Sequence, residues 1–204
     1  MTTIRHTTRS ALFVLGIITL LFACSSVPIL RVTYRLPLQS PDLNGKEVYL
    51  RIEDNRPAKD IIGDRARDDF EHFTGLLVLY LSEGQGERTK LGVYDIKSIF
   101  QEALKNRLTR SGLKIVPETK TNQTGLVIKL DKFLLDLVDR KWKVNAVYKI
   151  ALVKEGQPLF SQTINGEAER LKVVGLEQAN IVISELVSDM INRPDLAEIF
   201  KKLE

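Results

Sequence analysis

The chain has 204 residues, a formal net charge of +4 and one cysteine, Cys24. Arg5 and Arg9 lie in an N-terminal segment that we expect to be removed, so the mature part carries a charge of about +2. The chain has no run of Lys and Arg interleaved with aromatic residues, so nucleic-acid binding has no support. The length suits one domain with a sizeable core, and a single cysteine excludes an internal disulfide.

The N-terminal segment has the pattern of a bacterial lipoprotein signal peptide. Basic residues precede an apolar stretch from Ala11 to Phe22, and Leu21-Phe22-Ala23-Cys24 ends it. The stretch has about 12 residues, which suits a secretory signal core better than a membrane-spanning helix of ~20 residues. The bulky Leu21 disfavours conventional cleavage. We therefore predict cleavage just before Cys24 and lipid attachment to its sulfur. The alternative is a buried Cys24 in an uncleaved anchor.

Lipidation would make Cys24 the membrane anchor and would remove the only thiol from catalysis. Two or more acyl chains hold a protein stably at a membrane. A bacterial lipoprotein cysteine resembles this case, with a diacylglyceryl group on sulfur and usually an acyl group, such as palmitate, on the amine. Ser25 follows Cys24, and the aspartate that resembles an inner-membrane retention signal is absent there. We expect the outer membrane, facing the periplasm, with the inner membrane as the alternative.

We divide the chain into a signal peptide (1–23), a lipidated N-terminal tether (24–45) and a single periplasmic domain (46–204). The tether contains Pro28 and Pro37 and a potential short strand from Leu30 to Leu36. Alternating apolar residues predict a half-buried strand from Lys46 that ends before Pro57. The following segments are predicted in turn as a charged loop at 58–73 with a short strand at Ile61-Ile62, a buried strand at 76–81 and a flexible loop at 82–90.

Two amphipathic helices are predicted in the second half of the chain. The first begins after Asp95 as N-cap and ends at Gly112, and the second runs from about Leu176 to Pro194. Between them, Leu113 to Val116 forms a strand and an antiparallel meander follows, with a bulge near Asp131-Lys132 and a hairpin turn at Glu155-Gly156. The predicted fold class is α+β, a mainly antiparallel sheet with both helices packed on one face.

Catalytic and metal-binding motifs are lacking. Gly84-Gln85-Gly86 has neither the phosphate-loop nor the dinucleotide pattern, and no nucleophile elbow is present. His72 lies near Asp68, Asp69 and Glu71, but a lone imidazole among surface carboxylates lacks the second His or Cys that metal sites use. We favour a solvated loop there. We predict no catalytic residue, no metal, no cofactor and no enzymatic activity.

One polar cluster, Asp54-Asn55-Arg56-Pro57, follows the strand that starts at Lys46. Asp54 and Arg56 are candidate contacts for a partner because a sheet end would hold them in place. The local alternative is an Asx turn, in which Arg56 pairs with Asp54 or Asp60.

Several motifs taken together are similar to those of the YajG-like lipoproteins. They are the cysteine motif, Val32-Thr33-Tyr34-Arg35-Leu36-Pro37, Pro41-Asp42-Leu43-Asn44-Gly45 with the strand that follows, Phe100-Gln101-Glu102-Ala103-Leu104, Arg110-Ser111-Gly112-Leu113 and Pro194-Asp195-Leu196-Ala197-Glu198-Ile199-Phe200-Lys201. Residues 58–90 depart most from the family. The resemblance implies an outer-membrane lipoprotein without an established enzymatic activity.

Three functions remain open. The first is a non-enzymatic, lipid-anchored periplasmic interaction module whose partner is an envelope protein or a cell-wall component. The second is an auxiliary lipoprotein subunit of an envelope transport system of the ABC type, for which an exposed apolar groove would be expected. The third is an enzyme acting on envelope glycans or lipids, which would need a buried carboxylate pair in a cleft.

Overall fold

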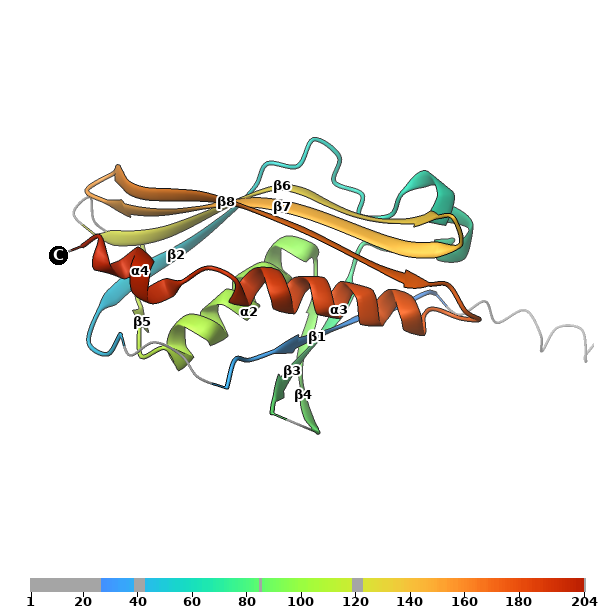
Figure 1. Cartoon of the computed structure of the whole chain (residues 1–204), viewed down its shortest axis with the longest axis horizontal. Coiled ribbons are helices and arrows are strands. Elements are labelled where there is room, and N and C mark those ends of the chain that lie inside the picture. Colours follow the sequence, from blue (N-terminus) through green and yellow to red (C-terminus); the bar gives the residue numbers. More distant parts are fainter. Residues whose placement is uncertain (1–26, 39–42, 85, 119–122, 204) are drawn as a thin grey trace, which may run out of the picture.

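The computed structural model describes residues 27–38, 43–84, 86–118 and 123–203. Cys24, the signal peptide and the first residues of the tether lie outside these ranges. The chain forms two sheets with helices between them, and the α+β prediction is confirmed (Figure 1). Within the described residues, no helix is both long and apolar enough to cross a membrane.

The larger sheet has five strands in the order β5-β2-β6-β7-β8. Its core is a meander of three long antiparallel strands, as predicted. The strands are β2 (Glu47–Asp54), β5 (Lys114–Ile115), β6 (Thr124–Val138), β7 (Lys141–Lys154) and β8 (Gln157–Leu171). The predicted bulge is confirmed, because the β6–β7 register shifts between Leu130 and Lys132. The predicted hairpin turn is also present, where Glu155 and Gly156 both have positive φ angles.

The smaller sheet has three strands in the order β1-β3-β4. They are β1 (Leu30–Arg35), β3 (Leu77–Glu83) and β4 (Glu87–Tyr94). The second sheet was not predicted. The loop expected at 82–90 is wrong in its second half, since β4 pairs antiparallel with β3 from Glu87 onward. Gly84 and Gly86, which suggested a long flexible loop, instead form a tight turn with positive φ angles.

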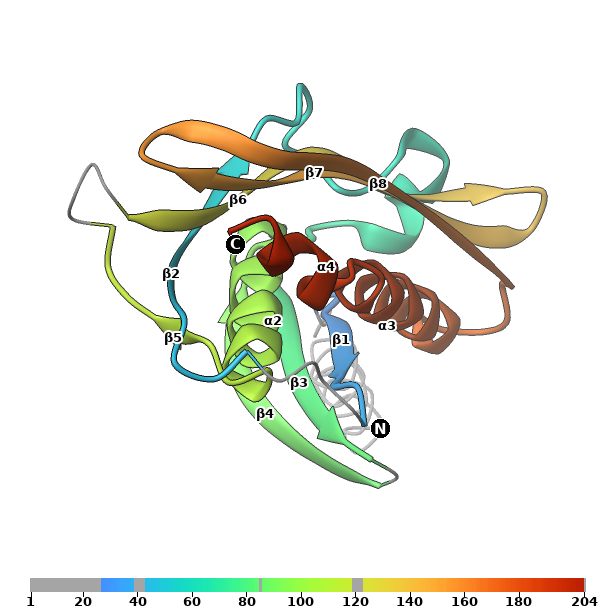
Figure 2. The same ribbon diagram turned by 60° about the vertical axis from the view of Figure 1, so that its left-hand side comes forward.

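The residues that the structure describes also form four helices: the 3-10 helix η1 (Asp64–Phe70), α2 (Ile96–Arg110), α3 (Glu177–Asn192) and α4 (Leu196–Lys201). The helices α2, α3 and α4 lie beneath the large sheet, and the small sheet lies below α2 with its strand β1 alongside α3 (Figures 1 and 2). Asp95 caps α2 as predicted, because its carboxylate accepts the Ser98 N–H at 2.8 Å. Both α2 and α3 pack against the large sheet, as predicted: Phe100 of α2 contacts β6 and β7, and Met190 of α3 lies against Gly166 of β8.

Aromatic contacts join α2 to the underside of the large sheet. Phe100 of α2 lies edge-on to Phe133 of β6 and to Tyr148 of β7, with ring centroids 6.3 and 5.8 Å apart.

A buried arginine joins α2 to the end of α3. The guanidinium of Arg107 donates to the carbonyls of Ile191 and Pro194, which have no helical partners at the end of α3. Burial lowers the pKa of Arg107. The polar contacts thus lock α2 to α3 inside an otherwise apolar core.

A glycine lets α3 approach the large sheet closely. A Cβ added at Gly166 of β8 would lie 2.7 Å from the Cγ of Met190 and 2.8 Å from a methyl carbon of Leu186. Both side chains belong to α3 and are buried. The absence of a side chain at this position therefore sets the separation of α3 from β8.

Two strand directions differ from the prediction. The strand β2 runs parallel to both β5 and β6, and β1 runs parallel to β3. The long connections between these strands contain η1, α2 or other strands, so hairpins do not form between them. Alternation along a strand reports only which face is buried and says nothing about the direction of its neighbour.

Part of the predicted tether belongs to the folded domain. Leu30, Val32 and Tyr34 are fully buried in the core. The folded domain therefore includes Leu30 to Arg35, which the sequence analysis had placed in the tether before Lys46. Only five residues, Ser25 to Ile29, then lie between the predicted lipid attachment site and Leu30, the first buried residue of those that the structure describes.

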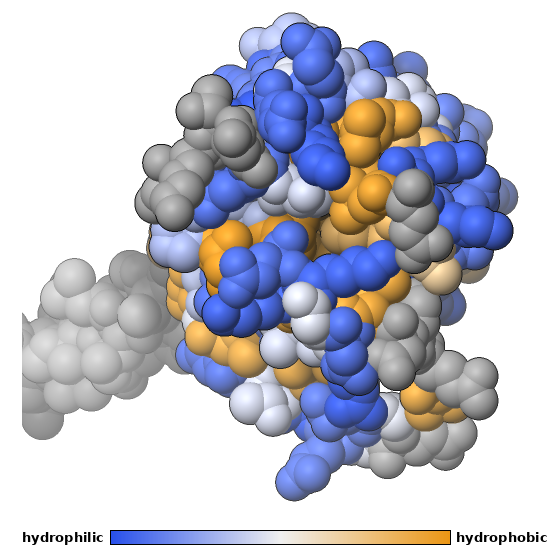
Figure 3. Space-filling view, turned by 90° about the vertical axis from the view of Figure 1, so that its left-hand side faces the viewer, coloured by the Kyte–Doolittle hydropathy of each residue, from blue (hydrophilic) through white to orange (hydrophobic). Residues whose placement is uncertain are grey.

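The end of the molecule that carries the β7–β8 hairpin has a mixed surface. Figure 3 shows hydrophobic residues among hydrophilic ones on this end. The exposed Leu159 of β8 lies there, two residues into the strand.

Candidate functional site

One edge of β1 pairs with β3, and polar side chains of α3 satisfy the other edge. Three backbone N–H groups of β1 donate to α3: Arg31 to Asn180 Oδ1 at 2.8 Å, Thr33 to Ser184 Oγ at 2.9 Å and Arg35 to Ser188 Oγ at 3.0 Å. In return, α3 donates to β1 carbonyls: Ser188 Oγ to Thr33 at 3.3 Å and Asn192 Nδ2 to Arg35 at 2.8 Å. We call the row Asn180, Ser184, Ser188 and Asn192 the polar ladder.

The polar ladder works because two periodicities nearly coincide. Residues four apart on a helix are separated by about 6 Å along its axis. Residues two apart on a strand, whose N–H groups point to the same edge, are separated by about 6.6 Å. One side chain per helical turn therefore meets every second residue of β1. The helix serves as a substitute neighbour strand and blocks further strand pairing at this edge.

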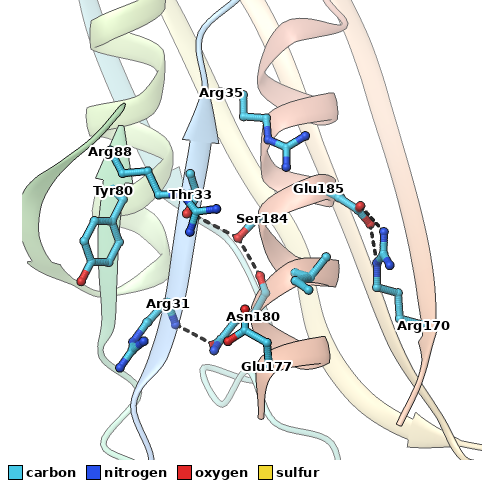
Figure 4. Close-up of a pocket in the computed structure, with 11 residues that line it drawn as sticks. Arg31, Thr33, Arg35, Tyr80, Arg88, Arg170, Glu177, Asn180, Ser184 and Glu185 are labelled. Atoms are coloured by element: carbon cyan, nitrogen blue, oxygen red, sulfur yellow. Dashed lines mark hydrogen bonds and ion pairs between the residues drawn. The ribbon is translucent and has the colours of Figure 1, made fainter. Parts of the chain in front are cut away.

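The strand alternation of β1 then decides which side chains remain outside. Leu30, Val32 and Tyr34 point into the core, so Arg31 and Arg35 point the other way, into a groove between the small sheet and α3. The groove has a volume of about 490 Å³. Its remaining lining comes from β3, β4, β8 and α3: Tyr80, Arg88, Arg170, Glu177, Ile181 and Glu185, with Thr33 and part of the polar ladder (Figure 4).

Arginines dominate the charge of the groove. The lining contains four arginines and two glutamates, so its formal charge is +2. Arg170 and Glu185 neutralise each other through a bidentate ion pair, which raises the pKa of Arg170. Within the described ranges, Arg31, Arg35 and Arg88 form no ion pair with an acidic side chain. These three guanidinium groups are therefore available to an anionic ligand.

The groove's chemistry suits binding rather than catalysis. Ser184 donates its hydroxyl proton to the Asn180 carbonyl at 2.6 Å and accepts the Thr33 N–H, so its oxygen is committed to the fold. Glu185 is held by Arg170. Planar guanidinium groups match carboxylate and phosphate oxygens in paired hydrogen bonds. A ligand carrying such groups fits this lining.

The structure places Asp54 and Arg56 in a local turn. The Asp54 carboxylate accepts the Arg56 backbone N–H at 3.1 Å and two guanidinium N–H groups, at 2.9 and 3.0 Å. Lys59 lies 3.3 Å from the same carboxylate. The side chain of Arg56 is only 6% exposed and that of Asp54 18%. The geometry is the Asx turn with an ion pair that the sequence analysis weighed as the local alternative, and it lies apart from the groove.

The residues around His72 are separate surface groups. His72 is 69% exposed and lies 3.6 Å from Glu71, while Asp69 binds Lys172 at 2.6 Å instead. Among the described residues, no group of three or more His, Cys, Asp or Glu side chains could hold a metal ion.

Sequence reasoning missed the groove, although two signals were visible. Asn180, Ser184, Ser188 and Asn192 recur at four-residue spacing on the predicted second helix, and Arg31, Thr33 and Arg35 alternate with apolar residues. The partnership of these two patterns could not be inferred, because about 150 residues separate them.

Comparison with known proteins gave only distant likenesses. Neither protein-family models nor curated protein sequences match the chain. Solved structures with partial likeness include protein XCC0632 of Xanthomonas campestris, from the family DUF330, with 11% identity over 84% of this chain and 95% of that one and a TM-score of 0.48. Rare lipoprotein B of Shewanella oneidensis has 12% identity, 76% and 96% coverage and a TM-score of 0.36.

A third structure is lipoprotein GNA1162 of Neisseria meningitidis, with 11% identity, 72% and 96% coverage and a TM-score of 0.31. Two of the three are named lipoproteins, and none of the three is named as YajG-like. All three TM-scores lie below 0.5, so the site is interpreted from its own residues.

Replacing Ser188 with Ala tests the polar ladder. The change leaves the Arg35 N–H without its acceptor and the Thr33 carbonyl without its donor. We expect the free energy of unfolding, measured by urea denaturation, to fall by roughly 1–3 kcal/mol. Ser161→Ala, at an exposed position of β8, is the matched control and should change it by less than ~0.5 kcal/mol. Equal effects of the two variants would contradict the ladder's role.

The Asp54–Arg56 pair predicts a pH dependence of stability. The hydrogen bond from Arg56 lowers the pKa of Asp54 from 3.8 to about 2. The stabilisation is therefore complete above pH 4 and disappears as the pH falls through 2. Asp54→Asn should lower the free energy of unfolding by about 2 kcal/mol near neutral pH and by much less near pH 2. Asp131→Asn, at an exposed bulge, is the control; a deficit independent of pH for Asp54→Asn would refute this assignment.

Proposed function

We propose that the protein is a lipid-anchored envelope lipoprotein that acts as a non-enzymatic periplasmic interaction module. Lipid on Cys24 would hold it at the outer membrane, facing the periplasm, and the groove between β1 and α3 would bind an acidic segment of an envelope protein. The proposal agrees with the resemblance to YajG-like lipoproteins in the sequence motifs.

The observation that carries the proposal is a set of three arginines in one groove that have no acidic partner among the residues the structure describes. Arg31 and Arg35 come from β1 and Arg88 comes from β4, so two strands of the small sheet present them together. Unpaired like charges repel one another, and a protein retains such a cluster at a cost in stability. An acidic segment would relieve this repulsion and form guanidinium–carboxylate pairs.

The groove favours a charged partner over an apolar cargo. An auxiliary transport lipoprotein that carries lipid was expected to show an exposed apolar groove, whereas this lining consists mostly of charged and polar side chains. An envelope enzyme was expected to hold a buried carboxylate pair, whereas Glu185 is 38% exposed and bound to Arg170. The interaction module is therefore the function that the geometry supports best.

Site-specific photo-crosslinking in cells tests the proposal. A photoreactive phenylalanine replaces Tyr80, whose side chain lines the groove. We expect one envelope protein to be captured, with the cross-linked peptide mapped by mass spectrometry to an acidic segment. The same probe in place of Lys149, exposed on β7, is the control and should not capture it.

Charge reversal provides the quantitative arm. Combining Arg31→Glu, Arg35→Glu and Arg88→Glu should reduce the capture at Tyr80 by at least about tenfold, because the partner's acidic segment would then face like charges. Lys149→Glu changes the charge outside the groove and should leave capture unchanged. Unchanged capture by the triple variant would refute the groove as the binding site.

Membrane fractionation tests the anchor separately. Cys24→Ala should move the protein from the membrane pellet to the soluble fraction, because the only acyl-accepting thiol is lost. Retention of this variant in the pellet would contradict lipid anchoring but would leave the binding role of the groove open to the cross-linking test.

A further inference from the structure

One end of the molecule collects the segments that lie next to the N-terminal anchor. The strand β1 starts there, and β3 starts beside it, since Leu30 pairs with Leu77. The helix α3 begins at the same end, where Asn180 accepts the Arg31 N–H. The last residues of β8 lead into α3 through residues 172–176, at the same end of the molecule (Figure 1).

This end is unusually apolar. Nine large hydrophobic side chains are exposed among the described residues, and six of them belong to the residues before β1 and β3, the end of β8 and the connection to α3. Five have exposed fractions between 45% and 60%, and the sixth, Val174, is fully exposed. We call these six the apolar rim: Val27, Ile29, Leu76, Leu171, Val173 and Val174.

The rim has no role in the core. Val173 and Val174 lie in the short connection between β8 and α3. A connection exposed to water does not need hydrophobic residues, so the fold does not explain them. Val27 and Ile29 precede Leu30, the first buried residue in the described part of the chain. Scattered exposed hydrophobic residues need no explanation, but a group gathered on one end marks a contact surface.

The length of the tether brings this end to the membrane. From Cys24 to Leu30 the chain spans six residue steps, which reach roughly 20 Å when fully extended. With lipid on Cys24, as in the proposed function on which this inference rests, the start of β1 must stay within that distance of the lipid headgroups. The domain therefore cannot stand tens of ångströms away, as a tether of 24–45 would have allowed.

Basic side chains accompany the rim. Arg31 is exposed at the start of β1, and the exposed Arg140 lies beside the connection after β8, where its carbonyl accepts the Lys172 N–H at 2.8 Å. Cationic side chains next to exposed apolar ones suit the boundary between anionic headgroups and acyl chains.

We propose that the apolar rim inserts into the headgroup region of the bilayer that holds the Cys24 lipid, so that the protein lies against the membrane by its β1 end with a fixed orientation. The groove then opens beside the membrane surface, and Arg31 lies at its membrane-proximal end. The β7–β8 hairpin points into the periplasm.

A fluorescent probe on the lipidated full-length protein tests this orientation. The chain has one cysteine, and lipidation blocks its thiol, so a cysteine introduced by Val174→Cys is the only site for a polarity-sensitive thiol dye. The labelled protein is reconstituted into vesicles of phosphatidylethanolamine and phosphatidylglycerol. We expect the emission maximum of the dye to be blue-shifted relative to the labelled protein unfolded in urea without detergent. We also expect lipids that are spin-labelled near the headgroup to quench the dye strongly.

The matched control is Leu159→Cys, which replaces another exposed hydrophobic residue, on β8 at the opposite end of the molecule. Leu159 lies twelve positions before Leu171 on β8, about 40 Å away along the strand. Its dye should remain water-like and should not be quenched. Unmodified protein, which contains Cys24 alone, should take up no dye.

The outcomes separate this inference from the proposed function. If the protein floats with the vesicles but its dye at position 174 stays water-like and unquenched, insertion of the apolar rim is refuted while lipid anchoring through Cys24 is supported. Protein that does not float overturns the lipid anchor and the orientation together. Equal quenching at positions 174 and 159 also overturns the fixed orientation.

Discussion

The contact between β1 and α3 is the interaction on which the rest of the structure depends. A strand edge must satisfy its backbone groups, and here the polar ladder replaces a neighbouring strand. Because the ladder holds α3 against β1, the opposite faces of both elements point into the core, and their remaining side chains form the groove. The small sheet also ends at β1 for this reason, since the helix occupies the position of a further strand.

The same contact relates the groove to the N-terminus. β1 is the first strand among the described residues, and it carries both the buried residues that tie it to the core and two of the groove's arginines. The predicted anchor therefore precedes the strand that carries two of the groove's arginines. With lipid on Cys24, as proposed, β1 would be both the link to the anchor and one wall of the groove, and this would restrict the distance between the domain and the membrane.

Local features were predicted well because short-range physics controls them. Asp95 caps its helix, Glu155-Gly156 turns a hairpin and the register shifts beside Asp131, all from residues within a few positions of one another. The parallel pairing of β2 with β6 and of β1 with β3 was not predicted, since strand alternation carries no information about partner or direction. The Asx turn at Asp54 and Arg56, considered as the local alternative to a partner contact, is present in the structure, and it too depends on neighbouring residues only.

By itself, the sequence determined the signal pattern with its lone cysteine, the α+β class, the meander and the positions of the two main helices. Periodicity and capping chemistry act within one element, so one element's residues are enough to reveal them. The tertiary structure alone decided that the chain forms two sheets, that Leu30–Arg35 belongs to the core and that Arg31, Arg35 and Arg88 share a groove. These features depend on contacts between segments that are far apart in the sequence. Such contacts are chosen by the apolar area that the whole chain buries on folding.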